Sequence, residues 1–450
     1  MNKHYYLGKM ITATAVVVAG TVALSGCSTG GTNNTAESAA PTHLAGTVSL
    51  WDTFTGTNDK AIVSVIKDFE AANPDVKVKV IPGQADDKLS QSIATSSDID
   101  VAISQSGNNV GLFCSSGALK DLTPYLKRDS IDMSQFSNAE KTYTSFEGNQ
   151  CTLPMLSDSY GLYLNTDLMQ SAGITTPPKT LSELESDALR LTTYNADGSI
   201  KVLGFNPIMG SYENSPSRYA PIVGATWLNK KGESNFADQA GWKEVMTWQK
   251  AFVDKIGYDK LRAFTAGLGE EFSGDNAFYT GQIAMMFDGD WRVAHIVQDK
   301  LAESGLHYTT APTPTADDHT ELYGASDIDG TVLGIAKSSR QPELAWALLK
   351  YLTTDTGVIR KLTNALKGGA PVASLNSPDL KLPAEFMTFS SAASNSHSAS
   401  RPPTVIGASQ LSSLESYWEK WQAGNGGDLA AGLAQVDKTV NNSIALSKGP

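Results

Sequence analysis

The sequence is short of basic residues, cysteine and histidine. Its 450 residues include 35 Lys and Arg against 47 Asp and Glu, with three Cys and six His. The formal charge of −12 repels nucleic acid and anionic lipid headgroups, so we expect neither as a partner. The histidines have no metal-ligand spacing, and no G-x-S-x-G, H-E-x-x-H or P-loop sequence occurs. The sequence therefore predicts no metal, no cofactor and no nucleophilic catalysis.

What the sequence does contain is the composition of a folded protein. Hydrophobic residues make up 41% of the chain and charged residues 18%, which is typical of a globular protein. A chain of this length exceeds one ordinary hydrophobic core, so two lobes are expected. No internal repeat is visible.

The N-terminus has the pattern of an export signal. Lys3 and Lys9 precede a 13-residue apolar stretch, Ile11 to Ala23, which is too short to span a bilayer comfortably. The stretch runs into Leu-Ser-Gly-Cys, which resembles a bacterial lipobox. That resemblance implies cleavage before Cys27 and attachment of diacylglyceryl, with palmitate chains, to its thiol.

The same pattern predicts where the mature protein begins. Removing the signal peptide, residues 1–26, removes two lysines and lowers the formal charge from −12 to −14. Residues 27–45 are small and polar, as a flexible tether is. We therefore expect an extracytoplasmic protein held at the cell membrane only by the lipid on Cys27. A plain secreted protein is the alternative.

Strand and helix patterns alternate from Gly46 onward. Residues 47–51 form a β-rich run, residues 60–72 have helical spacing, and residues 76–81 alternate apolar and charged side chains. A further strand at residues 98–104 leads into a loop and a helix. This order predicts an α/β fold with an open, largely parallel sheet.

Later segments continue the α/β pattern. The sequence predicts strands at 159–165 and 283–287, a hairpin at 224–236 and a helix from Pro342. Two further helices are expected within the C-terminal 40 residues. Cys114 and Cys151 are the two cysteines that remain after lipidation of Cys27. The sequence is compatible either with a disulfide between them or with two free thiols.

Several stretches, in this order, resemble the extracellular solute-binding proteins of ABC importers, specifically the carbohydrate-binding group that includes maltose-binding proteins. The resemblance implies a two-lobed, hinged, type II periplasmic-binding-protein-like fold with ligand in the interlobe cleft. It also implies a monomer without enzymatic activity whose partners are a carbohydrate and the transmembrane subunits of an ABC permease. The stretches are residues 46–56, 73–83, 100–126, 160–184, 278–291 and 334–353.

The resemblance also implies how the chain is divided. The first lobe would comprise residues 46–157 plus 311–368, and the second residues 158–310 plus 369–450. Crossings between the lobes would then lie near Ser157 to Ser159, near Thr310 and near Gly368. A ligand that touches both lobes would favour the closed form, by its differential affinity for that form.

A sugar presents hydroxyl groups at its rim and C–H faces above and below. Aromatic faces and carboxylate or amide groups suit it. Trp291, which follows a strand and a Gly turn, is the leading candidate, since the family commonly stacks an aromatic residue there; capping the core is its alternative. The other ligand-binding candidates are Asp290, Asp158, Tyr160, Trp51, Asp52, Thr53, Phe54, Gln105, Ser106, Asn108, Trp227, Asp329 and Arg401.

Two other functions stay open. A glycoside hydrolase needs two carboxylates flanking the bond, and Asp288 with Asp290 or Glu270 with Glu271 are the pairs to consider. Such close neighbours in sequence are more often turn or surface charges. A binding protein for a non-sugar solute, such as a polyamine or peptide, is the second alternative, because carboxylates pair with cations.

Overall fold

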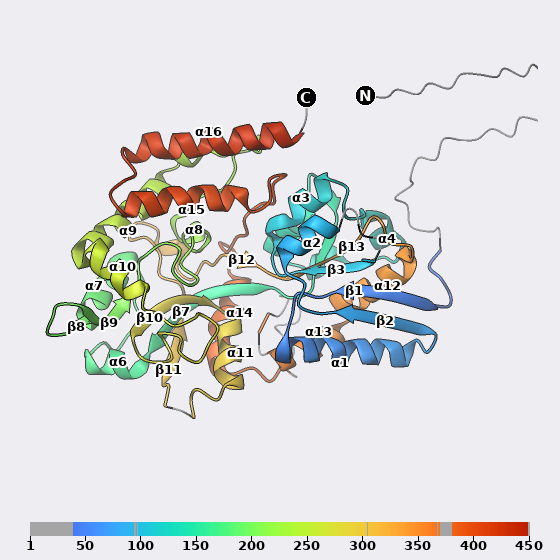
Figure 1. Cartoon of the computed structure of the whole chain (residues 1–450), viewed down its shortest axis with the longest axis horizontal. Coiled ribbons are helices and arrows are strands. Elements are labelled where there is room, and N and C mark those ends of the chain that lie inside the picture. The colour runs from blue at the N-terminus through green and yellow to red at the C-terminus, as the bar shows by residue number, and fades with distance from the viewer. Residues whose placement is uncertain are drawn as a thin grey trace, which may run out of the picture. The chain divides into compact units, whose positions relative to one another are not determined.

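The computed structural model of the chain describes residues 39–448, apart from residues 94, 95, 97, 304, 367 and 370–379. The described residues form one compact unit, in which the two larger β-sheets each carry their own helices (Figure 1). The signal pattern, the lipobox and Cys27 lie outside the described residues. Among the described helices, none is both long and apolar enough to cross a membrane.

The first lobe is built on a five-stranded sheet with the order β2-β1-β3-β13-β6. Strands β1, β2 and β3 are parallel, as predicted, while β13 is antiparallel to both of its neighbours. The carboxyl ends of β1 and β3 therefore lie side by side. The strands are β1 Gly46–Trp51, β2 Val76–Ile81, β3 Val101–Ser104, β6 Thr152–Pro154 and β13 Val332–Ile335.

Helices pack on this sheet through apolar stripes. In α1 the side chains of Ile62, Val65, Ile66 and Phe69 are buried at helical spacing. The helix begins at Gly56 rather than at Lys60, because the polar residues before Lys60 already form its first turn. The helices are α1 Gly56–Ala72, α2 Asp86–Ser92, α3 Val110–Ser115, α4 Thr123–Arg128, α5 Asn138–Tyr143, α12 Pro342–Thr354 and α13 Thr356–Leu366.

The second lobe is built on a six-stranded sheet with the order β11-β7-β10-β9-β8, in which β12 also pairs with β7. Strand β10 is buried along its whole length, as the apolar run that ends at Phe287 predicts. It runs antiparallel to β7 and parallel to β9. The strands are β7 Asp158–Asn165, β8 Thr193–Tyr194, β9 Ile200–Phe205, β10 Ile283–Gly289, β11 Tyr308–Ala311 and β12 Ile328–Asp329.

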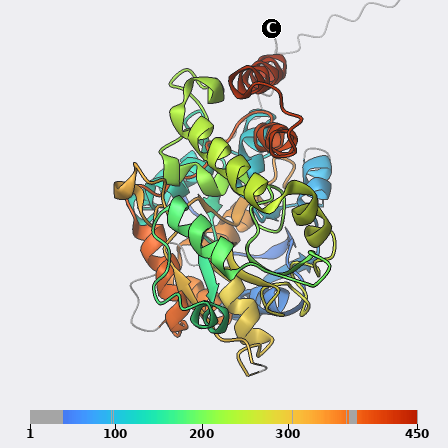
Figure 2. The same cartoon turned by 90° about the vertical axis from the view of Figure 1, so that its left-hand side faces the viewer.

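The second lobe carries more helices than the first. The last two, α15 and α16, lie side by side at the top of Figure 2, and Trp418 of α15 is fully buried in the lobe's core. The helices are α6 Thr166–Ser171, α7 Leu181–Leu191, α8 Pro216–Tyr219, α9 Ala240–Ile256, α10 Tyr258–Thr265, α11 Trp291–Gln298, α14 Met387–Ser394, α15 Ser409–Gln422 and α16 Leu429–Lys448.

The chain passes between the two sheets near two of the three expected places. Strand β6 belongs to the first sheet and β7, which begins at Asp158, to the second. A later crossing brings Gly369 beside Ser157, whose amide donates to the Gly369 carbonyl at 3.2 Å. The crossing expected near Thr310 is wrong, because β11 and β12 both pair with β7. The chain returns to the first sheet only between Asp329 and Val332.

Two further predictions concern local structure. The expected hairpin at 224–236 contains no strand: a turn joins Asn229 and Glu233, while Trp227 and Phe236 pack edge-on against Trp242 in the core. Burial of these rings outweighs strand pairing here. The two cysteines are joined in a disulfide with a Cα–Cα distance of 5.8 Å, which ties α3 to the start of β6.

Candidate functional site

Four of the predicted residues come together where β7 begins and β10 ends. The first three residues of β7 carry Asp158 and Tyr160, and β10 delivers Asp290 and Trp291. The rings of Tyr160 and Trp291 meet edge to face, 5.2 Å between centroids. The sequence predicts that Trp291 lies in a turn. In the structure it is the first residue of α11, so the helix fixes its backbone.

The carboxyl groups of this cluster are buried close to each other. Asp158 and Asp290 both lie at Gly369, whose amide donates to Asp290 Oδ2 at 3.2 Å. Burial raises the pKa of Asp290 to about 7. Burial, followed by the neighbouring Asp290 and Asp329, raises the pKa of Asp158 well above its usual value. The proximity of the two groups therefore disfavours the state in which both are ionised.

A second cluster joins the loop after β3 to the second lobe. The Ser106 hydroxyl donates to Asp329 Oδ2 at 2.7 Å, and the Gly107 amide donates to Asp329 Oδ1 at 2.9 Å. Asn108 hydrogen-bonds to Arg401. Of the predicted loop residues, Gln105 is exposed. Asp329 is the register partner of Asp158, so the two clusters are neighbours.

Arg218, which the sequence analysis missed, connects these clusters. Its guanidinium group lies 3.3 Å from the centre of the Tyr160 ring and forms ion pairs of 2.6 Å with Asp327 and Glu213. Burial raises the pKa of Asp327 to about 7, against the attraction of Arg218. Arg218 lies in the four-residue helix α8, which is too short to leave a periodic pattern, so no sequence signal marks it.

A cavity of about 50 Å³ lies between the lobes at this point. Asn108, Asp329, Arg218 and Arg401 are among the side chains that line it. Arg401 is 7% exposed, and among the described residues neither its Nε nor its Nη1 has a hydrogen-bond partner. Small-molecule sites usually have about 300–1,000 Å³, so a ligand larger than a few atoms needs the lobes to separate.

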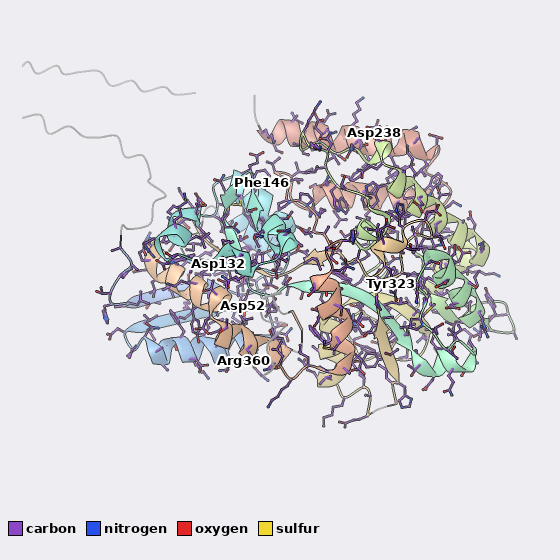
Figure 3. All side chains as sticks on the ribbon, turned by 180° about the vertical axis from the view of Figure 1, so that it is seen from behind. Asp52, Asp132, Phe146, Asp238, Tyr323 and Arg360 are labelled. Atoms are coloured by element: carbon purple, nitrogen blue, oxygen red, sulfur yellow. A yellow bond between two sulfur atoms is a disulfide. The ribbon has the colours of Figure 1, made fainter. Side chains whose placement is uncertain are left out.

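The residues that end β1 form a third group. Asp52 is fully buried, and its Oδ1 accepts from the Phe54 amide at 2.9 Å. Burial raises the pKa of Asp52 to about 6. Within the described part of the chain, Asp52 Oδ2, the Thr53 hydroxyl and the Trp51 indole N–H have no partner. Figure 3 places Asp52 on the side of the first sheet that faces the second lobe.

Two of the predicted residues lie in hydrophobic cores. Trp227 is 4% exposed and packs against Phe236 and Trp242, and its ring centre lies 5.8 Å from the guanidinium carbon of Arg401, which lines the interlobe cavity. Phe54 is buried in the core of the first lobe. Within the described residues, no group of three or more His, Cys, Asp or Glu is placed to hold a metal ion.

Comparison with known proteins agrees with this architecture. Residues 55–359 match the pattern of the family described as bacterial extracellular solute-binding protein. The chain belongs to this family. The maltodextrin-binding protein MdxE of Bacillus subtilis is 24% identical over 326 residues, which cover 69% of each chain.

Solved structures of the same solute-binding fold superpose over most of the chain. CpMnBP1 with mannotriose bound has a TM-score of 0.74 and 24% identity, covering 88% of this chain and 99% of that chain. The GacH receptor of Streptomyces glaucescens, solved unliganded and with acarbose, has a TM-score of 0.70 and 20% identity, covering 89% and 100%. This solute-binding protein therefore has the two-lobed fold that its sequence predicts.

Proposed function

We propose that this solute-binding protein captures an oligosaccharide between its lobes and delivers it to the permease of an ABC importer. The observation that carries the proposal is the composition of the interlobe contact. It combines the aromatic faces of Tyr160 and Trp291 with carboxyl and guanidinium groups, of which Asp329 and Arg401 line the cavity. Aromatic faces bind the C–H surfaces of a sugar, and charged groups bind its hydroxyls.

The names of similar proteins support the same class of ligand. Mannotriose, acarbose and maltodextrin appear in them. The protein would release its ligand chemically unchanged, because capture by closure needs no bond to be broken. It would act as a monomer. Its lobes would divide as the two sheets do, with crossings near Ser157, Gly330 and Gly369.

The membrane attachment belongs to the same proposal. The lipobox-like Leu-Ser-Gly-Cys sequence would place a lipid on Cys27 after removal of residues 1–26. The tether would keep the binding lobes near the permease, which raises their effective concentration there. Labelling of growing cells with radioactive palmitate tests this point: the wild-type chain incorporates label and Cys27→Ser does not. Label in neither chain contradicts the anchor.

Ligand class is tested by a thermal-shift screen of oligosaccharides on the chain from Ser28 onward. Binding to the folded state at about 1,000 times Kd stabilises it by about 4 kcal/mol. We expect at least one neutral or amino-substituted oligosaccharide to raise Tm by several degrees. A panel in which only peptides or polyamines raise Tm overturns the carbohydrate assignment and leaves the solute-binding role in place.

A further inference from the structure

Carboxyl groups outnumber cations around the interlobe contact. Five acidic side chains, Asp158, Glu213, Asp290, Asp327 and Asp329, lie there with two guanidinium groups, Arg218 and Arg401. Arg218 is shared between Glu213 and Asp327, at 2.6 Å from each. The three other carboxyl groups, those of Asp158, Asp290 and Asp329, therefore share the one remaining guanidinium group, that of Arg401. A neutral sugar leaves that excess negative charge uncompensated.

The excess is concentrated at Asp158 and Asp290. Among the described residues, neither carboxyl group forms an ion pair with a lysine or arginine. Asp290 is 2% exposed, and its Oδ2 accepts from the Gly369 amide at 3.2 Å, beside the carboxyl group of Asp158. Two adjacent carboxyl groups in such a place either retain a proton or bind a cation.

The surrounding side chains suit a cationic group on an otherwise neutral ligand. The Trp291 ring lies against Tyr160, and indole faces attract ammonium groups. Arg401 supplies the independent observation. Its side chain is only 7% exposed, and it lines the cavity together with Asp329. Within the described residues, its Nε and Nη1 have no hydrogen-bond partner. Those two donors require acceptor oxygens on the ligand.

A carboxylate ligand would satisfy Arg401 but would meet Asp327 and Asp329 beside it. Hydroxyl groups accept from Arg401 and donate to the same aspartates, so they fit this wall without repulsion. A ligand that fits this site therefore has hydroxyl groups on the side of Arg401 and a cationic group on the side of Asp158 and Asp290. An amino sugar has both.

We propose that the ligand is a saccharide with a basic amino group, whose ammonium binds among Asp158, Asp290 and Asp329 while Arg401 donates to its hydroxyls. This inference rests on the proposed function and adds the substrate class. The ammonium compensates the negative charge that these neighbouring carboxyl groups would otherwise place side by side. The lobes separate to admit the sugar and close over it.

The test is calorimetric titration of the chain from Ser28 onward with matched pairs of ligands. Glucosamine with glucose, galactosamine with galactose, and the β-1,4-linked glucosamine disaccharide with cellobiose differ within each pair by the amino group. We expect one amino sugar to bind at least about tenfold more tightly than its neutral partner, as a charge-assisted contact implies. Asp158→Asn and Asp290→Asn should bring that ratio close to one. Asp299→Asn, an exposed residue just after α11, is the control.

Each result decides the inference. If a neutral sugar binds as tightly as its amino partner, the amino-sugar assignment is overturned and the proposed function is left intact. The same holds if Asp158→Asn and Asp290→Asn are both folded by thermal unfolding and neither changes the ratio of the two affinities. Spermidine binding without any saccharide binding overturns both. If no saccharide of either kind binds, here or in the oligosaccharide screen, the proposed function fails and the amino-sugar assignment fails with it.

Discussion

Closure of the lobes requires a residue without a side chain at position 111. Gly111 of α3 lies against the backbone of Thr404, in the segment of the second lobe that carries Arg401. A Cβ atom at Gly111 would lie 2.3 Å from the Thr404 carbonyl oxygen and 2.7 Å from its nitrogen. These are backbone atoms, so no change of rotamer can relieve the contact. We therefore predict that Gly111→Ala opposes the closed form.

The size of the effect follows from the cost of overpacking. Forcing a methyl group into a close-packed contact costs about 1–3 kcal/mol. Here the open form avoids that cost, so ligand binding has to supply it when the lobes close. Because about 1.4 kcal/mol corresponds to a factor of ten, the ligand's Kd should rise about 5- to 150-fold. Calorimetric titration measures Kd, and small-angle X-ray scattering with saturating ligand measures closure.

Gly274→Ala is the matched control, because a Cβ atom there meets nothing within 4 Å. It should leave both Kd and scattering unchanged. The reasoning is refuted if Gly111→Ala binds ligand as tightly as the wild type. It is also refuted if the variant closes normally with ligand but unfolds at a lower temperature without ligand. The close approach of residue 111 to Thr404 would then be present in the open form as well as in the closed form.

Three further predictions address single features. Gly289→Ala would place a Cβ atom 2.2 Å from the Trp291 ring and displace it, so oligosaccharide affinity should fall about tenfold in the same titration; unchanged affinity contradicts stacking on Trp291. Replacing both cysteines by serine opens a bond that spans 37 residues, and urea unfolding should show a loss of about 4 kcal/mol, with no loss counting against the disulfide. Asp52 binds its proton more tightly when folded, so the wild-type free energy of unfolding should fall by up to about 3 kcal/mol as pH rises from about 4 through about 6. Asp52→Asn should flatten that fall, and an unchanged pH profile contradicts the assignment.

Much of the fold is predictable because its signals are local. The apolar spacing of α1 and α12 and the buried run of β10 follow directly from hydrophobic periodicity. The crossing expected near Thr310 failed for a different reason. Residues 308–311 and 328–329 both pair with β7, and strand partners that are distant in sequence leave no local pattern.

Three candidate residues lie at strand termini: Asp158 begins β7, Asp329 ends β12, and Asp290 directly follows β10. Trp227 shows the limit: its turn does not reveal that the ring packs in the core against Phe236 and Trp242, with Arg401 of the cavity wall beside it. Arg218 shows the opposite case. It reaches the site through ion pairs with Glu213 and Asp327, which only the folded chain brings together.

The central claim is that an oligosaccharide binds between the lobes with Trp291 as one wall. Titration calorimetry of the oligosaccharide panel against the wild-type chain and Trp291→Ala tests it most directly, with Trp421→Ala in α15, a tryptophan that packs on the core of the second lobe, as the control. The account predicts that one oligosaccharide binds the wild type and the control with a Kd of about 1 μM, about −8 kcal/mol, and that Trp291→Ala weakens it about tenfold or more. Folded protein that binds no saccharide, or equal affinity in Trp291→Ala, contradicts the account.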